Sequence, residues 1–155
     1  MVDLSKQAEP AVQKLLKSDE EQLYEKLGIR AKAIAQDPTK GSSFEPQVTY
    51  DKAQMGLKED VMEFGQRLFN RLDLEAYKLI CGSETEDTND RKDLIKAFST
   101  NDEATIAAAL SALLVTNLGL APAIAAVVAV ILVKRFFRPV YEEFCQTWKK
   151  NLPTV

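Results

Sequence analysis

The chain has 155 residues, of which 46% are hydrophobic and 28% are charged, and its formal net charge at pH 7 is −3. This composition is too hydrophobic for a disordered chain and too highly charged for a polytopic membrane protein, so a soluble globular fold is expected. The acidic balance leaves no broad cationic field for a phosphate backbone, which argues against nucleic acid as a partner.

One domain covering residues 1–155 is expected, because a chain of this length can bury a core without cross-links. Its first expected helix starts near Ala8 and ends near Lys17. Pro10 sets the start, because proline is tolerated in the first turn of a helix and disrupts later turns.

A second helix is expected from residue 19 to about residue 36. Ser18 and Glu21 have the spacing of a capping box, in which the side chain of each residue accepts a hydrogen bond from the backbone amide of the other. Pro38 limits the helix, because the residue before a proline is disfavoured in the α region.

Residues 39–50 contain Gly, Ser and Pro without a sustained period and predict a loop. The strongest amphipathic helix of the chain is expected after this loop. Its apolar residues form one stripe that should face the core: Leu57, Val61, Phe64, Leu68, Leu72 and Leu79. Gly82 is expected to end this helix in the left-handed conformation.

Residues 83–93 form an acidic connector. They lack the alternating aspartates of a calcium-binding loop, so a solvated loop is expected there rather than a metal site. A short helix follows, with Leu94, Ile95 and Phe98 as its inward residues.

Residues 104–133 carry no charged side chain. Thr100 and Glu103 have the spacing of a second capping box, which predicts a helix that begins at the start of this stretch. Asn117 and Gly119 can adopt the positive φ of a helix end, and Pro122 suits the first position of a new helix. The uncharged stretch therefore predicts a hairpin of two helices rather than one long helix.

Small residues on both helices of this hairpin would allow close antiparallel packing: Ala104, Ala108, Ser111, Ala125, Ala126 and Ala129. The first helix, about 14 residues or roughly 21 Å long, falls short of the ~30 Å hydrocarbon core of a bilayer. A helix that is apolar on all sides must nevertheless be surrounded. Helices of the same domain are the favoured surroundings, and lipid or a homo-oligomeric interface remain as alternatives.

The chain changes character after residue 133. An apolar stripe continues through Phe144 and Trp148, but Pro139 lacks an amide donor and predicts a kink or break before them. The basic and aromatic segment "KRFFR" resembles the border of a membrane-inserted helix, although an ordinary amphipathic helix is the favoured interpretation. The candidate partner surface or membrane-interface surface comprises Lys134, Arg135, Phe136, Arg138 and Trp148.

The two cysteines, Cys81 and Cys145, lie far apart in the sequence and match no metal-binding or redox motif. This pattern predicts buried free thiols in a reducing compartment. The amino-terminal residues lack the charged and apolar pattern of a secretory signal, so a cytoplasmic location is expected.

Enzyme chemistry has little support in the residues. The chain contains no histidine, which removes imidazole as a base or as a metal ligand. Neither a nucleophile motif nor a glycine-rich phosphate loop is present in the sequence. We therefore predict no catalytic residue, no cofactor and no metal site.

These patterns predict an all-α, single-domain bundle of about six helices around a central hydrophobic hairpin at about residues 104–133. The expected function is a non-enzymatic module, adaptor or regulator, that binds another protein. The alternative is a membrane-active effector that releases the hairpin into a bilayer. In its architecture the buried hairpin resembles that of colicin-type pore-forming domains, and this resemblance implies pore formation.

Overall fold

The computed structural model describes residues 4–82, 89–138 and 140–152, and all its regular elements are helical, which confirms the all-α class. In chain order they are α1 (Leu4–Leu15), α2 (Glu20–Gln36), the 3-10 helix η1 (Pro38–Ser42), α3 (Lys52–Met55), α4 (Lys58–Cys81), α5 (Asn89–Ser99), α6 (Glu103–Leu118), α7 (Pro122–Phe136) and α8 (Tyr141–Lys150). The described residues thus contain eight α-helices rather than about six. The difference arises because α3 is a separate short helix between the expected loop of residues 39–50 and α4, and because α7 and α8 are separate helices.

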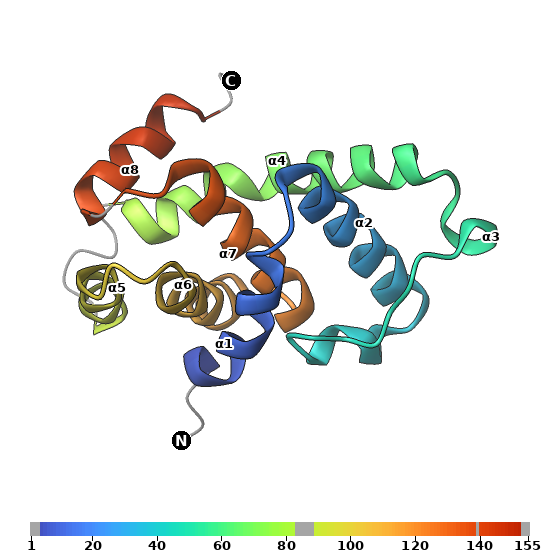
Figure 1. The fold of residues 1–155 in the computed structure, drawn as a ribbon, viewed down its shortest axis with the longest axis horizontal. Helices are drawn as coiled ribbons and strands as arrows, with labels where there is room; N and C mark the ends of the chain where they lie inside the picture. Colours follow the sequence, from blue (N-terminus) through green and yellow to red (C-terminus); the bar gives the residue numbers. More distant parts are fainter. Residues whose placement is uncertain (1–3, 83–88, 139, 153–155) are drawn as a thin grey trace.

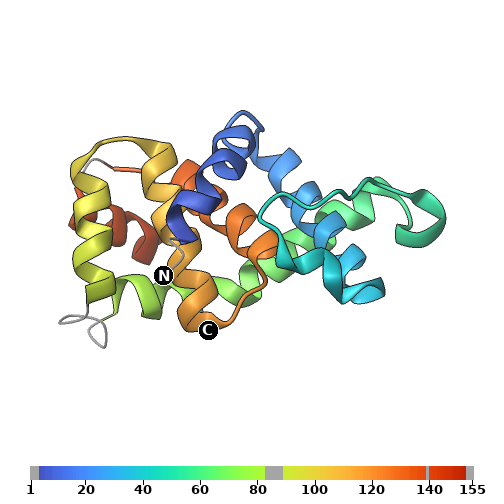
Figure 2. The same cartoon turned by 90° about the horizontal axis from the view of Figure 1, so that it is seen from below.

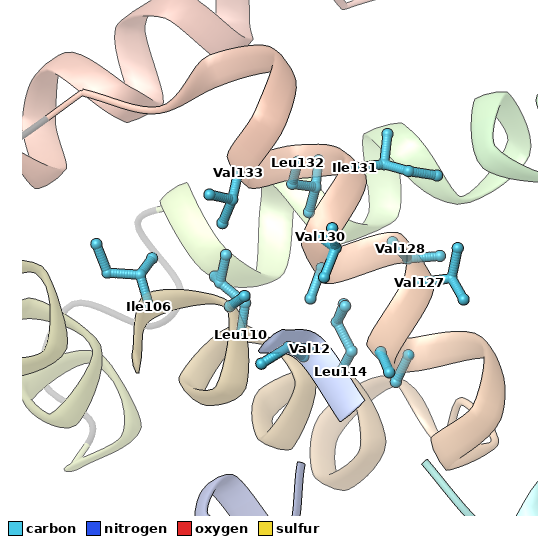
Figure 3. Close-up of a cluster of buried hydrophobic side chains, with 14 of the residues drawn as sticks. Val12, Ile106, Leu110, Leu114, Val127, Val128, Val130, Ile131, Leu132 and Val133 are labelled. Atoms are coloured by element: carbon cyan, nitrogen blue, oxygen red, sulfur yellow. The ribbon is translucent and has the colours of Figure 1, made fainter. Parts of the chain in front are cut away.

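α7 lies in the middle of the molecule and packs against α1, α2, α6, α8 and η1 (Figure 1). Twelve of its 15 residues are buried, including every residue from 123 to 133. Figure 3 shows its branched side chains beside those of α6 and Val12 of α1. Seven buried Val, Ile and Leu side chains on α7 contribute on the order of 10 kcal/mol, which is comparable to the net stability of a typical domain.

The caps of α2 and α6 differ from the predicted ones. Asp19, not Ser18, caps α2, and it forms a capping box with Gln22 in place of Glu21. The side chain of Asp102 accepts from the amide of Ala104 at the start of α6. Thr100 was expected there, but its hydroxyl group donates to the carbonyl of Ala97 at the end of α5. In both cases an aspartate nearer the first turn replaces the expected hydroxyl cap.

α1 begins at Leu4, several residues earlier than expected, and Pro10 therefore lies inside the helix. The ring of Pro10 is exposed, whereas Ala8, Val12 and Leu15 are buried. α1 packs along α6 with this buried face. The apolar contact offsets the backbone hydrogen bond that proline removes.

The expected hairpin turn joins α6 to α7. Asn117 lies in the last turn of α6, Gly119 follows the helix with a φ of 68°, and Pro122 is the first residue of α7. Of the two residues that could adopt the left-handed conformation, Gly119 does so and Asn117 stays helical. Gly82 at the end of α4 was also expected to be left-handed, but its φ is −77°.

Two of the inward residues expected on α5, Leu94 and Phe98, are buried, whereas Ile95 is exposed. Residues 83–88 of the expected connector lie outside the described residues, and residues 89–93 belong to α5 rather than to a loop. α7 ends at Phe136 and α8 begins at Tyr141, so the break expected around Pro139 is present, although Pro139 itself is not described.

Residues 37–57 connect α2 to α4 and contain η1 and α3, so most of η1 lies within the loop expected at residues 39–50. This segment and the adjoining parts of α2 and α4 form one end of the molecule, opposite α5 and α8 (Figures 1 and 2). A small second core holds the segment in place and includes Ile29, Ala33, Met55 and Val61.

α2 and α4 cross in close backbone contact. A Cβ atom added to Gly65 would lie 1.9 Å from the carbonyl oxygen of Tyr24, and one added to Gly28 would lie 2.1 Å from that of Val61. Both distances are far below van der Waals contact, so only glycine fits at these two positions. The close crossing places α4 against the rest of the core.

We expect Gly65→Ala to destabilise the protein by about 1–3 kcal/mol, because the added methyl group forces α2 and α4 apart. Helix propensity alone would favour alanine by about 1 kcal/mol, so a loss of stability identifies the close contact. Thermal unfolding followed by circular dichroism measures the difference. Asn70→Ala, on the exposed face of α4, is the control and should change stability by less than about 0.5 kcal/mol. If the Gly65→Ala variant melts at or above the temperature of the native chain, α2 and α4 do not cross as closely as described.

Candidate functional site

The five residues of the predicted basic and aromatic surface do not share one surface. Lys134 and Arg138 are exposed, Arg135 is partly buried, and Phe136 and Trp148 are buried with 1% and 0% of their surface exposed. The end of α7 at Phe136 and the new start of α8 turn the aromatic rings inward. The predicted surface is therefore divided between two exposed cations, one partly buried cation and two aromatic rings in the core.

Arg135 joins the end of α7 to α2. Its Nε atom lies 3.3 Å from a carboxylate oxygen of Glu20, and its Nη1 atom donates to the hydroxyl of Tyr24 at 3.3 Å. The hydroxyl of Tyr24 donates to the same carboxylate at 3.0 Å. The guanidinium group also lies over the rings of Phe69 and Phe136. Arg135 is therefore held inside the fold and is not a free surface cation.

Burial raises the pKa of the Tyr24 hydroxyl to about 12; the Arg135 charge opposes this rise and the Glu20 carboxylate adds to it. Tyr24 thus remains protonated and can donate to Glu20 throughout the physiological pH range. The cluster of Arg135, Glu20 and Tyr24 orders the surface end of α2 against α7.

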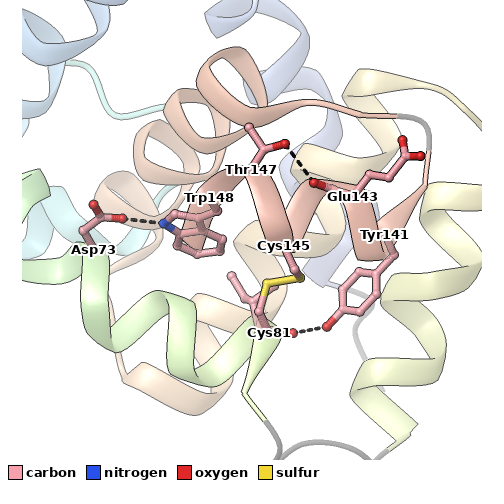
Figure 4. The surroundings of a disulfide bond; sticks show 8 residues. Asp73, Cys81, Tyr141, Glu143, Cys145, Thr147 and Trp148 are labelled. Carbon is pink, nitrogen blue, oxygen red and sulfur yellow. Dashed lines mark hydrogen bonds between the residues drawn. A yellow bond between two sulfur atoms is a disulfide. The ribbon is translucent and has the colours of Figure 1, made fainter. Parts of the chain in front are cut away.

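A buried carboxylate joins α4 to α8. Trp148 Nε1 donates to Asp73 Oδ1 at 2.6 Å, and Asp73 is only 2% exposed (Figure 4). Burial raises the pKa of the Asp73 carboxyl group, whereas the Trp148 bond and the Arg135 charge partly oppose the rise. The apolar stripe predicted for this helix does not include Asp73, and no sequence motif marks it. It follows Phe69 by four residues and precedes Ala76 by three, and this spacing places it on the buried face.

Cys81 and Cys145 form a disulfide bond between the last turn of α4 and α8, with their Cα atoms 5.7 Å apart (Figure 4). The prediction of two free thiols is therefore wrong. The cysteines are 64 residues apart in sequence, and only the packing of α8 on α4 brings them together. Disulfides persist mainly in oxidising compartments, so the argument from free thiols for a reducing compartment no longer holds.

A second buried cation, Arg30, anchors the segment after α2. Its Nη1 atom donates to the carbonyl oxygens of Phe44 at 3.1 Å and Ala123 at 2.9 Å. Burial lowers the pKa of Arg30 to about 10, and the charge of Glu45 opposes the shift. Arg30 therefore connects η1 and its following loop to the first turn of α7.

The apolar stripe predicted on α4 lies at the edge of the buried face, not at its centre. The buried residues of α4 are Val61, Gly65, Phe69, Asp73, Ala76 and Ile80. Val61 is thus the one member of the predicted stripe that is buried. Successive residues of a helix are rotated by about 100°. The centre of the buried face is therefore rotated by roughly 80° from the centre of the predicted stripe without Val61.

We call the remaining residues the outer stripe of α4: Leu57, Phe64, Leu68, Leu72 and Leu79. Leu57 is 54% exposed and the other four are partly exposed. Leu68, Leu72 and Leu79 pack against the edge of the main core. The ammonium group of Lys32 lies 4.7 Å from the centre of the Phe64 ring. The outer stripe is the longest row of large, incompletely covered apolar side chains on α4.

Among the described residues, no group of three or more Cys, Asp or Glu side chains is placed to hold a metal ion. Within the same residues, each helix is either too short or too polar to cross a membrane. Comparisons of the chain with protein-family models, with curated proteins and with solved structures give no match.

The buried Asp73 carboxyl group makes stability depend on pH. Its folded-state pKa is raised, so in the pH range above the unfolded value the folded chain retains a proton that the unfolded chain has lost. The stability from this proton is complete at acid pH and is lost as the pH rises through the folded pKa. Asp73→Asn keeps an acceptor for Trp148 without the charge.

We therefore expect the melting temperature of Asp73→Asn to rise relative to that of the native chain as the pH increases from about 4 to 7. Thermal unfolding of both proteins over this range measures the difference. Glu75→Gln removes an exposed carboxylate from the same helix and is the control. A constant difference between Asp73→Asn and the native chain would show that Asp73 does not titrate in this range.

Proposed function

We propose that this chain is a non-enzymatic helical module that binds another protein through the outer stripe of α4. The observation that carries the proposal is the incomplete burial of five large apolar side chains, one on the N-cap residue of α4 and four along one face of the helix. The stripe extends from Leu57 to Leu79, a rise of about 33 Å, which is long enough for the centre of a standard protein interface. Removing such side chains from water would favour association.

The surroundings of the outer stripe also suit an interface. Exposed charged residues of both signs, Asp60, Arg71 and Lys78, follow it on the solvent side. An apolar centre with a polar rim is the usual composition of a protein interface. The rim has no dominant sign, so the partner should contribute mainly an apolar ridge, such as one face of an amphipathic helix.

Rigidity of α4 supports the same proposal. The close crossing at Gly28 and Gly65, the disulfide at Cys81 and the Asp73–Trp148 bond hold the helix at several points along its length. A surface that is ordered before binding loses less conformational entropy on association. The outer stripe would thus be presented without rearrangement of the fold.

Leu57→Asp tests the proposal, because Leu57 is the most exposed member of the stripe and its replacement should leave the fold intact. Ile95→Asp is the matched control, since Ile95 on α5 is an apolar residue of similar exposure, 47% against 54% for Leu57. The immobilised native chain and both variants are incubated with a lysate of the cells that produce it, and retained proteins are quantified. We expect the Leu57→Asp variant to retain at least about fivefold less of the partner than the Ile95→Asp variant. A loss of this size is typical when an anchoring side chain of an interface is removed.

Direct contact is checked by a photo-reactive amino acid placed at Phe64, with the same amino acid at Asn70 as the control. Asn70 lies on the opposite side of α4, so only the Phe64 position should cross-link to the partner. Equal retention by both aspartate variants, or equal cross-linking at both positions, would contradict binding through the outer stripe.

The uncharged α6–α7 pair favours a second candidate function, insertion into a membrane. Glu103 lies at the start of α6 and Lys134 and Arg135 at the end of α7, so these charges bound the pair at the end away from the turn at Gly119. The turn could enter a bilayer first while the charges stay at the headgroups. The pair is short for this role, since 16 and 15 residues correspond to about 24 and 22 Å.

For this second candidate we expect dye release from anionic liposomes at mildly acid pH, and its loss in Asn117→Arg. Asn117 is exposed near the turn, so the added charge should leave the folded core intact. It would raise the free energy of moving the turn into the bilayer. Asn70→Arg makes the same change on α4 and should release dye like the native chain. Absence of release by the native chain, or equal release by both variants, would eliminate hairpin insertion.

A further inference from the structure

α8 is attached to the C-terminal half of α4 at three positions along its length. The Tyr141 hydroxyl donates to the carbonyl oxygen of Ile80, Cys145 is bonded to Cys81, and Trp148 Nε1 donates to Asp73 (Figure 4). Two of these attachments are hydrogen bonds and one is covalent. The disulfide lies between the two hydrogen bonds along α8.

An aromatic cluster lies between α8 and the helices that it covers. The Trp148 ring stacks on Phe136 of α7 with centroids 5.9 Å apart. Phe98 of α5 contacts the rings of Tyr141 at 5.6 Å and Phe144 at 5.1 Å. All five rings are buried. Removal of α8 from α4 would therefore expose a large apolar surface on α5 and α7.

The disulfide is more accessible than the rings on either side of it. Cys81 and Cys145 are both partly exposed, whereas Tyr141, Phe144 and Trp148 are buried. A thiolate must reach a sulfur atom to exchange with a disulfide, so exposure of this pair permits reduction in the folded state. α8 is also the last described helix, and the two residues after α7, Phe137 and Arg138, are not helical. α8 can therefore move away from α4 without bending another helix.

We propose that the Cys81–Cys145 disulfide is a redox-controlled latch, which a dithiol reductant opens to release α8 from α4 and uncover the aromatic cluster. One thiolate of the reductant attacks a sulfur of the pair, forms a mixed disulfide and displaces the other cysteine as a thiolate. The second thiol of the reductant then displaces the first cysteine. Two electrons and two protons pass from the reductant to the protein, which gains two thiols while the reductant becomes a disulfide.

Reduction removes the strongest of the three attachments. A disulfide that closes a loop of this length changes an opening equilibrium by roughly 30- to 1000-fold, whereas one hydrogen bond changes it by about two- to tenfold. The two hydrogen bonds and the aromatic contacts remain, so the reduced chain still folds and α8 opens more often. This goes beyond the proposed binding by α4, because the uncovered surface belongs to α5 and α7.

Hydrogen exchange of the native chain, with and without dithiothreitol, tests the latch. We expect the amides of α8 to exchange at least about tenfold faster after reduction, while those of α2 and α7 keep their protection. Emission of Trp148, the single tryptophan of the chain, should shift to longer wavelength at the same time. Re-oxidation should restore both signals.

A double variant, Cys81→Ala with Cys145→Ala, is the control. It should match the reduced native chain without reductant and should not respond when dithiothreitol is added. Unchanged exchange of α8 after complete reduction would overturn the latch. Equal acceleration in all helices would also overturn it, because the disulfide would then stabilise the whole fold rather than α8 alone.

Discussion

The structure depends on the burial of α7. This helix is apolar on every side, so it needs neighbours around its whole circumference, and α1, α2, α6 and α8 supply them. The amphipathic helices α1, α2 and α8 each turn one face toward α7, whereas α4 and α5 pack mainly on the helices around it. The protein can therefore be described as one apolar helix with a helical shell around it.

Polar groups that are buried or partly buried connect these helices to α7 and to one another. Arg30 connects the segment after α2 to the start of α7, and Arg135 connects the end of α7 to α2. Asp73 and Trp148 join α4 to α8 across the aromatic cluster. Such groups are costly to bury unless their hydrogen bonds are made, so each one selects a particular arrangement of helices. Apolar packing supplies stability, and these contacts supply register.

α4 has two roles in this arrangement. Its buried face closes one side of the core, with Gly65 in close contact with α2, while its outer stripe remains incompletely covered. The two faces lie roughly 80° apart, which a helix allows because neighbouring positions differ by about 100°. The same helix thus stabilises the fold and carries the outer stripe, which we propose as the binding surface.

The sequence by itself determined the all-α class, the division of residues 104–133 into two helices at Gly119, and the break before α8. These features depend on residues close together in the chain, where backbone preferences and apolar spacing act directly. The tertiary structure alone decided the Cys81–Cys145 bond, the burial of Asp73 and the rotation of the α4 stripe away from the centre of the core. Each depends on which helices become neighbours, and periodicity shows that a face is apolar without showing which partner covers it.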